Sequence, residues 1–218
     1  MNQMTLGRLS AVAPLADAEA ERPNQRAAAK QRTREKILAA AKALFAERGY
    51  EAATIRDIAK MAGMSTGAVF ASFTDKSDLF TEIAETEQVE LQRAMRAAAE
   101  GLAGRAAILA MLEAARERQA EGPALFQAVM GALWTPGLAD RVRRRLERRP
   151  VSALLVAAVH DELGGCAAAA DVAFIAEMIW DGHLAVLRRA ALGNVARDQI
   201  KTRIAEQVKL ILAGARRR

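Results

Sequence analysis

The chain has 218 residues, of which 52% are apolar and only 4% aromatic, and its 32 basic against 26 acidic residues give a net charge of +6 at neutral pH. This balance is that of a globular protein, and the abundance of alanine with few β-branched residues predicts an all-α fold. One cysteine, Cys166, and two histidines exclude a disulfide framework and a cysteine-rich zinc site. The sequence contains no long uncharged apolar run, and its first twenty residues lack the pattern of a signal peptide. We therefore expect a cytoplasmic protein without a membrane span.

Residues 1–29 contain Pro14 and Pro23 and lack helical periodicity, so we expect a flexible basic arm. Basic residues accumulate from its end into the next segment, at Arg22, Arg26, Lys30, Arg32, Arg34 and Lys36. Such a run is either a solvated tail or a segment that lies along nucleic acid phosphates, and the charge pattern alone does not decide between them.

Four helices are predicted next. The first presents apolar residues from Ile37 to Phe45 on one face and ends at Gly49, where a left-handed residue is expected. The second spans about 55–61, starts at the cap Thr54 and ends at Gly63.

Two further caps follow. Ser65 is expected to cap a short third helix that ends near residue 72. Asp75 is expected to cap a fourth helix that runs from Lys76 to about residue 100.

Three positions in the second and third helices favour a helix-turn-helix. Ala59 is small enough for close helix packing, Gly63 permits the turn, and Val69 locks the second helix, with Ile58 and Phe73 completing the apolar inside. The second helix of such a pair fits the major groove of B-form DNA. This spacing alone is weak, since small-residue turns between core helices are common.

The surrounding sequence makes the signal specific. Residues 54–76, TIRDIAKMAGMSTGAVFASFTDK, and residues 34–50, REKILAAAKALFAERGY, resemble the DNA-binding segment of the TetR family of transcriptional repressors. The close resemblance covers about residues 31–83, and residues 179–184, IWDGHL, are similar to a pattern in a later helix of the family. It implies a helix-turn-helix domain at 30–80, with its motif at 54–73, and a helical effector-binding and dimerisation domain at 81–218.

The candidate DNA contacts lie on this motif. The Ser65 cap offers backbone N–H groups to a phosphate, Thr66 and Thr54 offer hydroxyls, and Lys76 offers a cation at a helix N-terminus. Small side chains let the backbone approach the groove, and the Ala68 methyl suits a thymine methyl. The full candidate set is Thr54, Ser65, Thr66, Gly67, Ala68, Phe70, Ser72 and Lys76.

Two of these residues depart from the family pattern. Phe70 stands where the family usually has tyrosine, and Ser72 where it often has histidine. Phenylalanine cannot donate a hydrogen bond to phosphate. We therefore expect Phe70 to pack on the small helical core somewhat more readily than to contact DNA.

The remaining chain is predicted to be helix after helix. Breaks are expected at Gly104, 122–123, 135–137, near Pro150, at 164–165 and at 193–194. Apolar positions on the last two long helices exceed the needs of a monomeric surface, and the resemblance implies that these helices pair in a homodimer. The candidate dimer-interface residues are Ile175, Ile179, Val186, Ile200, Ile204, Val208 and Ile211.

An apolar effector pocket is also expected in this domain. Methionine adapts to varied ligand shapes, although each of these side chains could simply pack. The candidate lining residues are Met95, Met111, Phe126, Met130, Trp134, Leu155, Phe174 and Met178.

The sequence leaves two further features open. Glu177, Asp181 and His183 interrupt an apolar helix and either anchor a ligand or face solvent. The arginines of residues 141–149 form either an anion-binding patch or a solvated helix.

The function expected from all this is regulation of transcription. The chain lacks a phosphate-cradling glycine loop and has few histidines, so we expect no enzyme, no cofactor and no metal. The leading hypothesis is a ligand-responsive repressor that binds a palindromic double-stranded DNA operator as a homodimer and releases it when a small molecule binds. The alternatives are an activator, or a helical small-molecule-binding protein whose DNA binding has lapsed or become non-specific.

Overall fold

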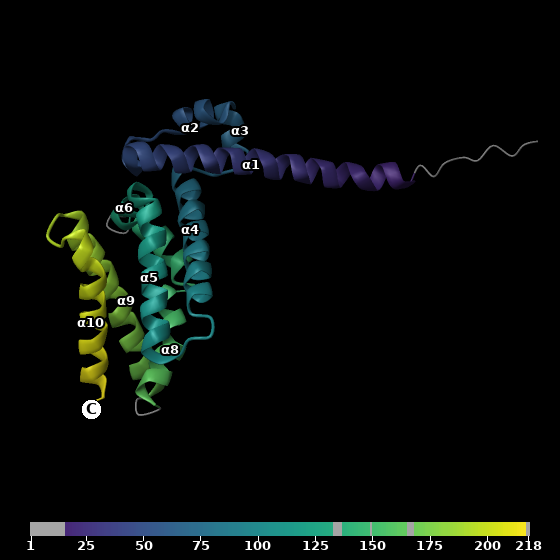
Figure 1. Cartoon of the computed structure of the whole chain (residues 1–218). Helices are drawn as coiled ribbons and strands as arrows, with labels where there is room; N and C mark the ends of the chain where they lie inside the picture. The colour runs from purple at the N-terminus through teal and green to yellow at the C-terminus, as the bar shows by residue number, and fades with distance from the viewer. Residues whose placement is uncertain (1–15, 133–136, 149, 165–167, 217–218) are drawn as a thin grey trace, which may run out of the picture.

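The computed structural model describes residues 16–132, 137–148, 150–164 and 168–216 (Figure 1). Every regular element within these ranges is a helix, and none is a strand. The all-α prediction is therefore confirmed.

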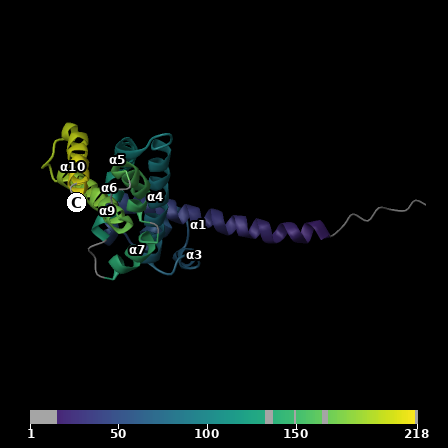
Figure 2. The ribbon, with the colours of Figure 1, turned by 90° about the horizontal axis from the view of Figure 1, so that it is seen from below.

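The first helix, α1 (Ala16–Ala52), starts earlier than expected. Residues 16–29, which we expected in a flexible arm, are helical, because alanine and charged helix formers outweigh Pro23 in this stretch. Gly49 interrupts the helix with φ 78° and ψ 170°, a conformation that favours glycine, so the predicted end of the helix is marked by a kink. The N-terminal part of α1 projects far from the rest of the molecule (Figures 1 and 2).

The three helices that follow are α2 (Ile55–Ala62), α3 (Thr66–Phe70) and α4 (Lys76–Ala98). Each begins at its predicted cap: backbone N–H groups donate to the side chains of Thr54, Ser65 and Asp75 over 3.2, 3.2 and 2.7 Å. The third helix is shorter than predicted, because it ends at Phe70.

Helices then continue to the end of the described chain. They are α5 (Gly104–Glu121), α6 (Pro123–Ala132), α7 (Leu138–Leu146), η1 (Val151–Leu154), α8 (Leu155–Leu163), α9 (Ala169–Ala191), η2 (Arg197–Gln199) and α10 (Ile200–Ala215). The predicted breaks at residues 122, 150, 164 and 193 fall between helices, and Gly104 and Pro123 are the first residues of α5 and α6. Residues 135, 136 and 165 lie outside the described residues.

The side chains form two hydrophobic cores. The first core joins α1–α4 with residues of α6 and α7, among them Leu125 and Val142. The second core joins the far part of α4 with α5 and α8–α10. The domain boundary expected after residue 80 therefore does not separate the packing units, because α4 runs through both cores and α6 and α7 pack on the first.

Candidate functional site

The helix-turn-helix packs as the sequence predicted. Ile58, Ala59, Val69 and Phe73 are all buried in the first core. Gly63 adopts the left-handed conformation, with φ 68° and ψ 35°, and its N–H donates to the Lys60 carbonyl over 3.2 Å. The glycine thus makes the tight turn that allows α2 and α3 to meet.

The opposite side of this pair faces solvent. Thr54, Ser65, Thr66, Gly67 and Phe70 are exposed. The other candidates, Ala68, Ser72 and Lys76, are half-buried. We call the exposed set the α2–α3 face.

Phe70 does not pack on the small core, which corrects the expectation from the sequence. Its side chain is 57% exposed, whereas Phe73, three residues later, is 2% exposed and fills the core position. Spacing along a short helix does not tell which of two nearby aromatic rings turns inward. The exposed Phe70 ring is therefore accessible to a binding partner.

Lys76 has partners inside the chain. Its ammonium donates to the backbone carbonyls of Tyr50 and Glu51 over 2.8 and 3.2 Å and lies 4.2 Å from the centre of the Tyr50 ring. The cation therefore satisfies carbonyl groups at the end of α1. Its contact with a phosphate stays a prediction, and it would compete with these bonds.

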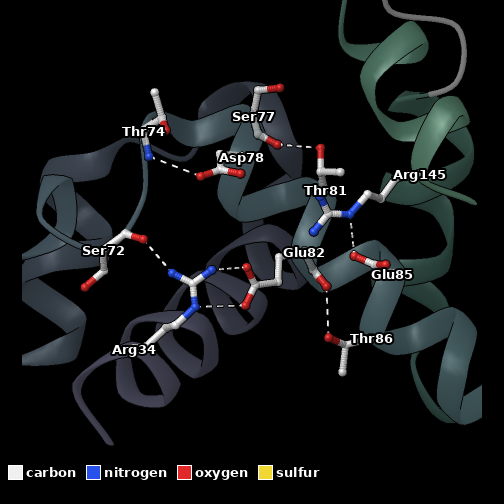
Figure 3. Close-up of polar contacts among 10 residues, drawn as sticks. All are labelled: Arg34, Ser72, Thr74, Ser77, Asp78, Thr81, Glu82, Glu85, Thr86 and Arg145. Carbon is white, nitrogen blue, oxygen red and sulfur yellow. Dashed lines mark hydrogen bonds and ion pairs between the residues drawn. The ribbon is translucent and has the colours of Figure 1, made fainter. Parts of the chain in front are cut away.

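Arg34, counted above among the basic run, also points inward (Figure 3). Its guanidinium pairs with both carboxylate oxygens of Glu82, donates to the Ser72 carbonyl and lies 4.1 Å from the centre of the Phe73 ring. This arginine joins α1, the end of the helix-turn-helix and α4. It positions the recognition segment rather than offering its charge to a ligand.

Other basic residues remain on the surface. On the projecting part of α1 and on α2 the exposed cations are Arg26, Lys30, Arg32, Lys36, Arg56 and Lys60. This exposure is compatible with both interpretations of the basic run, a solvated segment and a phosphate-binding segment. The run is nevertheless helical.

A cavity of about 690 Å³ lies between the two cores. Its walls come from α1, α4, α5, α6, α7, η1 and α9. Of the predicted effector residues, Phe126 and Met130 line it. The sequence missed Trp180 and Leu184 of α9 and the alanines of α1, because nothing in a helical pattern tells which neighbour a face meets.

The other predicted pocket residues lie elsewhere. Met95, Met111 and Leu155 are buried in the second core, so they pack rather than line a cavity. Phe174 and Met178 are 60% and 42% exposed on α9. Trp134 lies outside the described residues.

His183 lies beside this cavity. It is 1% exposed, stacks on Trp180 with ring centres 5.1 Å apart, and its Nε2 lies 3.1 Å from Oε1 of Gln119. Because an amide oxygen only accepts, Nε2 carries the hydrogen. Burial, together with the nearby charge of Arg116, lowers the pKa of His183 to about 4 against a smaller opposing effect of Glu113, so the ring is neutral at pH 7. Glu177 and Asp181, in contrast, are exposed.

The predicted dimer residues turn inward. Ile175, Ile179, Val186, Ile200, Ile204 and Val208 are buried in the chain's own second core, and only Ile211 is half-buried. Apolar periodicity marks the covered face of a helix without telling what covers it. The exposed apolar side chains on the same two helices are Phe174, Met178 and Leu210, at 60%, 42% and 72%.

The arginines of α7 connect this helix to α4. Arg141 pairs with Asp75 over 3.0 Å and Arg145 with Glu85 over 2.6 Å (Figure 3 shows the second pair). Arg144 and Arg148 are exposed, and Arg149 lies outside the described residues. Part of this run therefore holds α7 in place.

The described residues form neither a membrane-spanning helix nor a cluster of metal ligands. None of their helices is long and apolar enough to cross a membrane. They hold no group of three or more histidine, cysteine, aspartate or glutamate side chains suited to a metal ion.

Comparison with known sequences finds relatives of the first core. Residues 37–83 match the bacterial regulatory proteins of the tetR family. The transcriptional regulator AcrR of Shigella flexneri is 45% identical over 58 residues, which are 27% of either chain. The transcriptional repressor Rv1474c of Mycobacterium tuberculosis is 45% identical over 71 residues, or 33% of this chain and 37% of the relative. The chain thus spans only 27% and 37% of the length of these two relatives.

Comparison with solved structures extends the likeness to most of the fold. The fatty acid degradation regulator FadR of Bacillus halodurans has a TM-score of 0.68 at 18% identity, over 84% of this chain and 96% of that one. The repressor FadR of Thermus thermophilus, solved with lauroyl-CoA, has a TM-score of 0.66 at 23% identity, over 83% and 94%. At such identities the likeness concerns the fold alone.

Proposed function

Because residues 37–83 match the tetR family of bacterial regulatory proteins, we propose that this chain is a transcriptional repressor of that family. In this proposal it binds a palindromic operator in the cytoplasm as a homodimer and releases it when a small molecule binds. The observation that carries the proposal is the α2–α3 face, which exposes hydroxyls, a glycine and one phenyl ring above a fully packed helix pair.

This face has the chemistry of a DNA-reading surface. Thr54 and Thr66 can donate to phosphate or base edges, and Gly67 and Ala68 allow close approach of the backbone. We assign to Phe70 an apolar contact with the major groove, such as a thymine methyl, in place of a phosphate hydrogen bond. The exposed cations of α1 and α2 would add sequence-independent affinity for phosphates.

A twofold dimer would present two such faces. Phe174 and Met178 of α9 and Leu210 of α10 form an exposed apolar set on neighbouring helices, away from the projecting part of α1 (Figure 2). Pairing of these helices with a second copy would bury that set. Two recognition helices related by a twofold axis can reach successive turns of a duplex, which is why the operator is proposed to be palindromic.

The test is a gel-shift titration at fixed salt. The probe is the DNA upstream of the gene that encodes this chain, and the comparison is a scrambled duplex of the same composition. We expect tighter binding to the upstream DNA, weakened about tenfold or more by Phe70→Ala and Thr66→Ala, since one good base contact contributes about 1–3 kcal/mol. Leu102→Ala and Thr86→Ala are the matched controls, because both residues are exposed and lie outside the α2–α3 face.

The alternative function makes a different prediction. A small-molecule-binding protein with non-specific DNA binding would hold upstream and scrambled DNA equally, and Phe70→Ala would leave both affinities unchanged. That result would overturn the repressor proposal.

A further inference from the structure

The cavity between the two cores has a feature that the sequence did not predict: one of its walls is α1. Ala39, Ala43 and Ala46 recur at intervals of four and three residues, so they share one face of α1, and all three line the cavity. Figure 1 shows α2 and α3 on one side of α1 and α5 and α6 on the other. A molecule in the cavity would therefore contact α1 on the side opposite α2 and α3.

The other walls come from α6 and α7, which pack on the first core, and from α9 of the second core. Phe126 and Met130 come from α6, Leu146 from α7, and Trp180 and Leu184 from α9. The volume of about 690 Å³ lies within the usual range for small-molecule sites. Large apolar walls facing short alanine side chains leave space for an apolar ligand without an opening deep in either core.

The charges around the cavity indicate the class of ligand. Its lining holds three cations and three carboxylates. Lys42 pairs with Glu87, Arg118 pairs with both Glu87 and Glu121, and Arg143 pairs with Glu147. Because every charged side chain among the described lining residues has an opposite partner, an anionic or cationic ligand would gain little and would have to displace an existing pair.

We propose that this seam cavity, bounded by α1 in front and by α6, α7 and α9 behind, binds an uncharged, mainly apolar small molecule. The site shares Phe126 and Met130 with the effector pocket expected from the sequence. It excludes Met95, Met111 and Leu155, which are buried in the second core. It also suits a different ligand from an acyl-CoA, the class found in the Thermus thermophilus neighbour, since the phosphates of such a ligand need unpaired cations.

Occupancy of this site bears on DNA binding through two helices. The ligand contacts α1 directly, and it contacts α7, whose Arg141 and Arg145 hold α4 at Asp75 and Glu85. A ligand that binds better when α1 and α6 stand apart shifts the molecule toward that arrangement. This step rests on the proposed function, whereas binding to the cavity does not.

The experiment uses the full chain and the uncharged fluorescent probe N-phenyl-1-naphthylamine. Ala43→Leu places three extra carbons into the cavity from an exposed position of α1, and leucine is a good helix former, so the variant is expected to fold. We expect its Kd for the probe to rise at least tenfold, and the same for Ala39→Leu. The control Ala97→Leu, at an exposed site of α4 outside the cavity, should bind as the unaltered chain does.

Competition tests the ligand class. 1-Dodecanol should displace the probe at lower concentration than laurate or lauroyl-CoA, which have the same chain length but carry charge. If Ala39→Leu and Ala43→Leu both left probe binding unchanged, the proposed site would be wrong. If lauroyl-CoA displaced the probe at a lower concentration than dodecanol, the proposed ligand class would be wrong.

A gel shift on the same samples separates this proposal from the proposed function. Dodecanol should release upstream DNA from the unaltered chain and from Ala97→Leu at concentrations that leave Ala43→Leu bound. If the chain binds no specific DNA while the probe and its competitors behave as expected, the cavity stands and the repressor proposal fails. If the chain binds specific DNA but Ala43→Leu leaves probe binding unchanged, the repressor proposal stands and the cavity proposal fails.

Discussion

The first and second cores reach the same helical architecture by different means. In the first core the side chains of Thr54, Ser65 and Asp75 each accept a backbone hydrogen bond at the start of a helix. In the second core the residues that precede α5, α8, α9 and α10 make no side-chain cap bond, and at α5 the Arg105 N–H donates instead to the distant Glu162 carboxylate over 2.8 Å. Local interactions define the helices of the first core, whereas tertiary packing defines those of the second.

The likeness to other proteins divides in the same way. The family match covers residues 37–83, which lie in the first core, whereas structural similarity spans more than four fifths of the chain at 18–23% identity. If the α2–α3 face binds a DNA duplex as proposed, this partner of fixed shape would constrain individual residues of the first core. A helical packing unit tolerates many apolar replacements if volume and pattern are kept.

The largest expected effect tests whether the two cores unfold separately. Phe80→Ala removes a fully buried ring of the first core that contacts Phe45 and Tyr50, and Leu155→Ala removes a fully buried side chain of the second. We expect losses of about 3–5 and about 2–5 kcal/mol in the free energy of unfolding. Since α4 runs through both cores, urea denaturation followed by circular dichroism should show one transition for each variant. Two transitions, of which Phe80→Ala shifts only one, would show that the cores are independent.

A smaller effect belongs to the second core alone. The unfolded chain protonates His183 near its ordinary pKa of 6.5, whereas the folded chain does so only near 4. Unfolding therefore takes up a proton between these values, and the free energy of unfolding falls as the pH falls from about 6.5 toward 4, by up to about 3 kcal/mol. Above pH 6.5 this contribution is fully present.

His183→Gln keeps a donor for Gln119 and should remove most of that pH dependence. The measurement is the urea midpoint at pH 7, 6 and 5, where carboxyl groups contribute little. If the urea midpoint fell equally with pH in the unaltered chain and in His183→Gln, the buried ring would not be the source of the acid sensitivity.

The smallest effect concerns the caps. Thr54→Ala should destabilise the first core by about 1 kcal/mol, because the Asp57 N–H loses its acceptor. Ala103 precedes α5, and its extended backbone, at φ −135° and ψ 165°, is the conformation that a capping serine needs. We expect Ala103→Ser to stabilise the chain by up to about 1 kcal/mol, as thermal unfolding would show. If Ala103→Ser lowered the unfolding temperature instead, the start of α5 would not be able to use a local cap.

The helices and the helix-turn-helix could be predicted from local sequence patterns alone. Caps, turn glycines and apolar spacing act between residues close in the chain, so Thr54, Gly63, Ser65 and Asp75 could be read directly. The sequence could not determine which partner covers an apolar face, because that depends on residues far apart in the chain. Contacts between distant segments turn Ile179 and Val208 inward and hold the charges of Arg34 and Lys76 within the fold. They also bring Ala43 of α1 and Trp180 of α9 to the lining of one cavity.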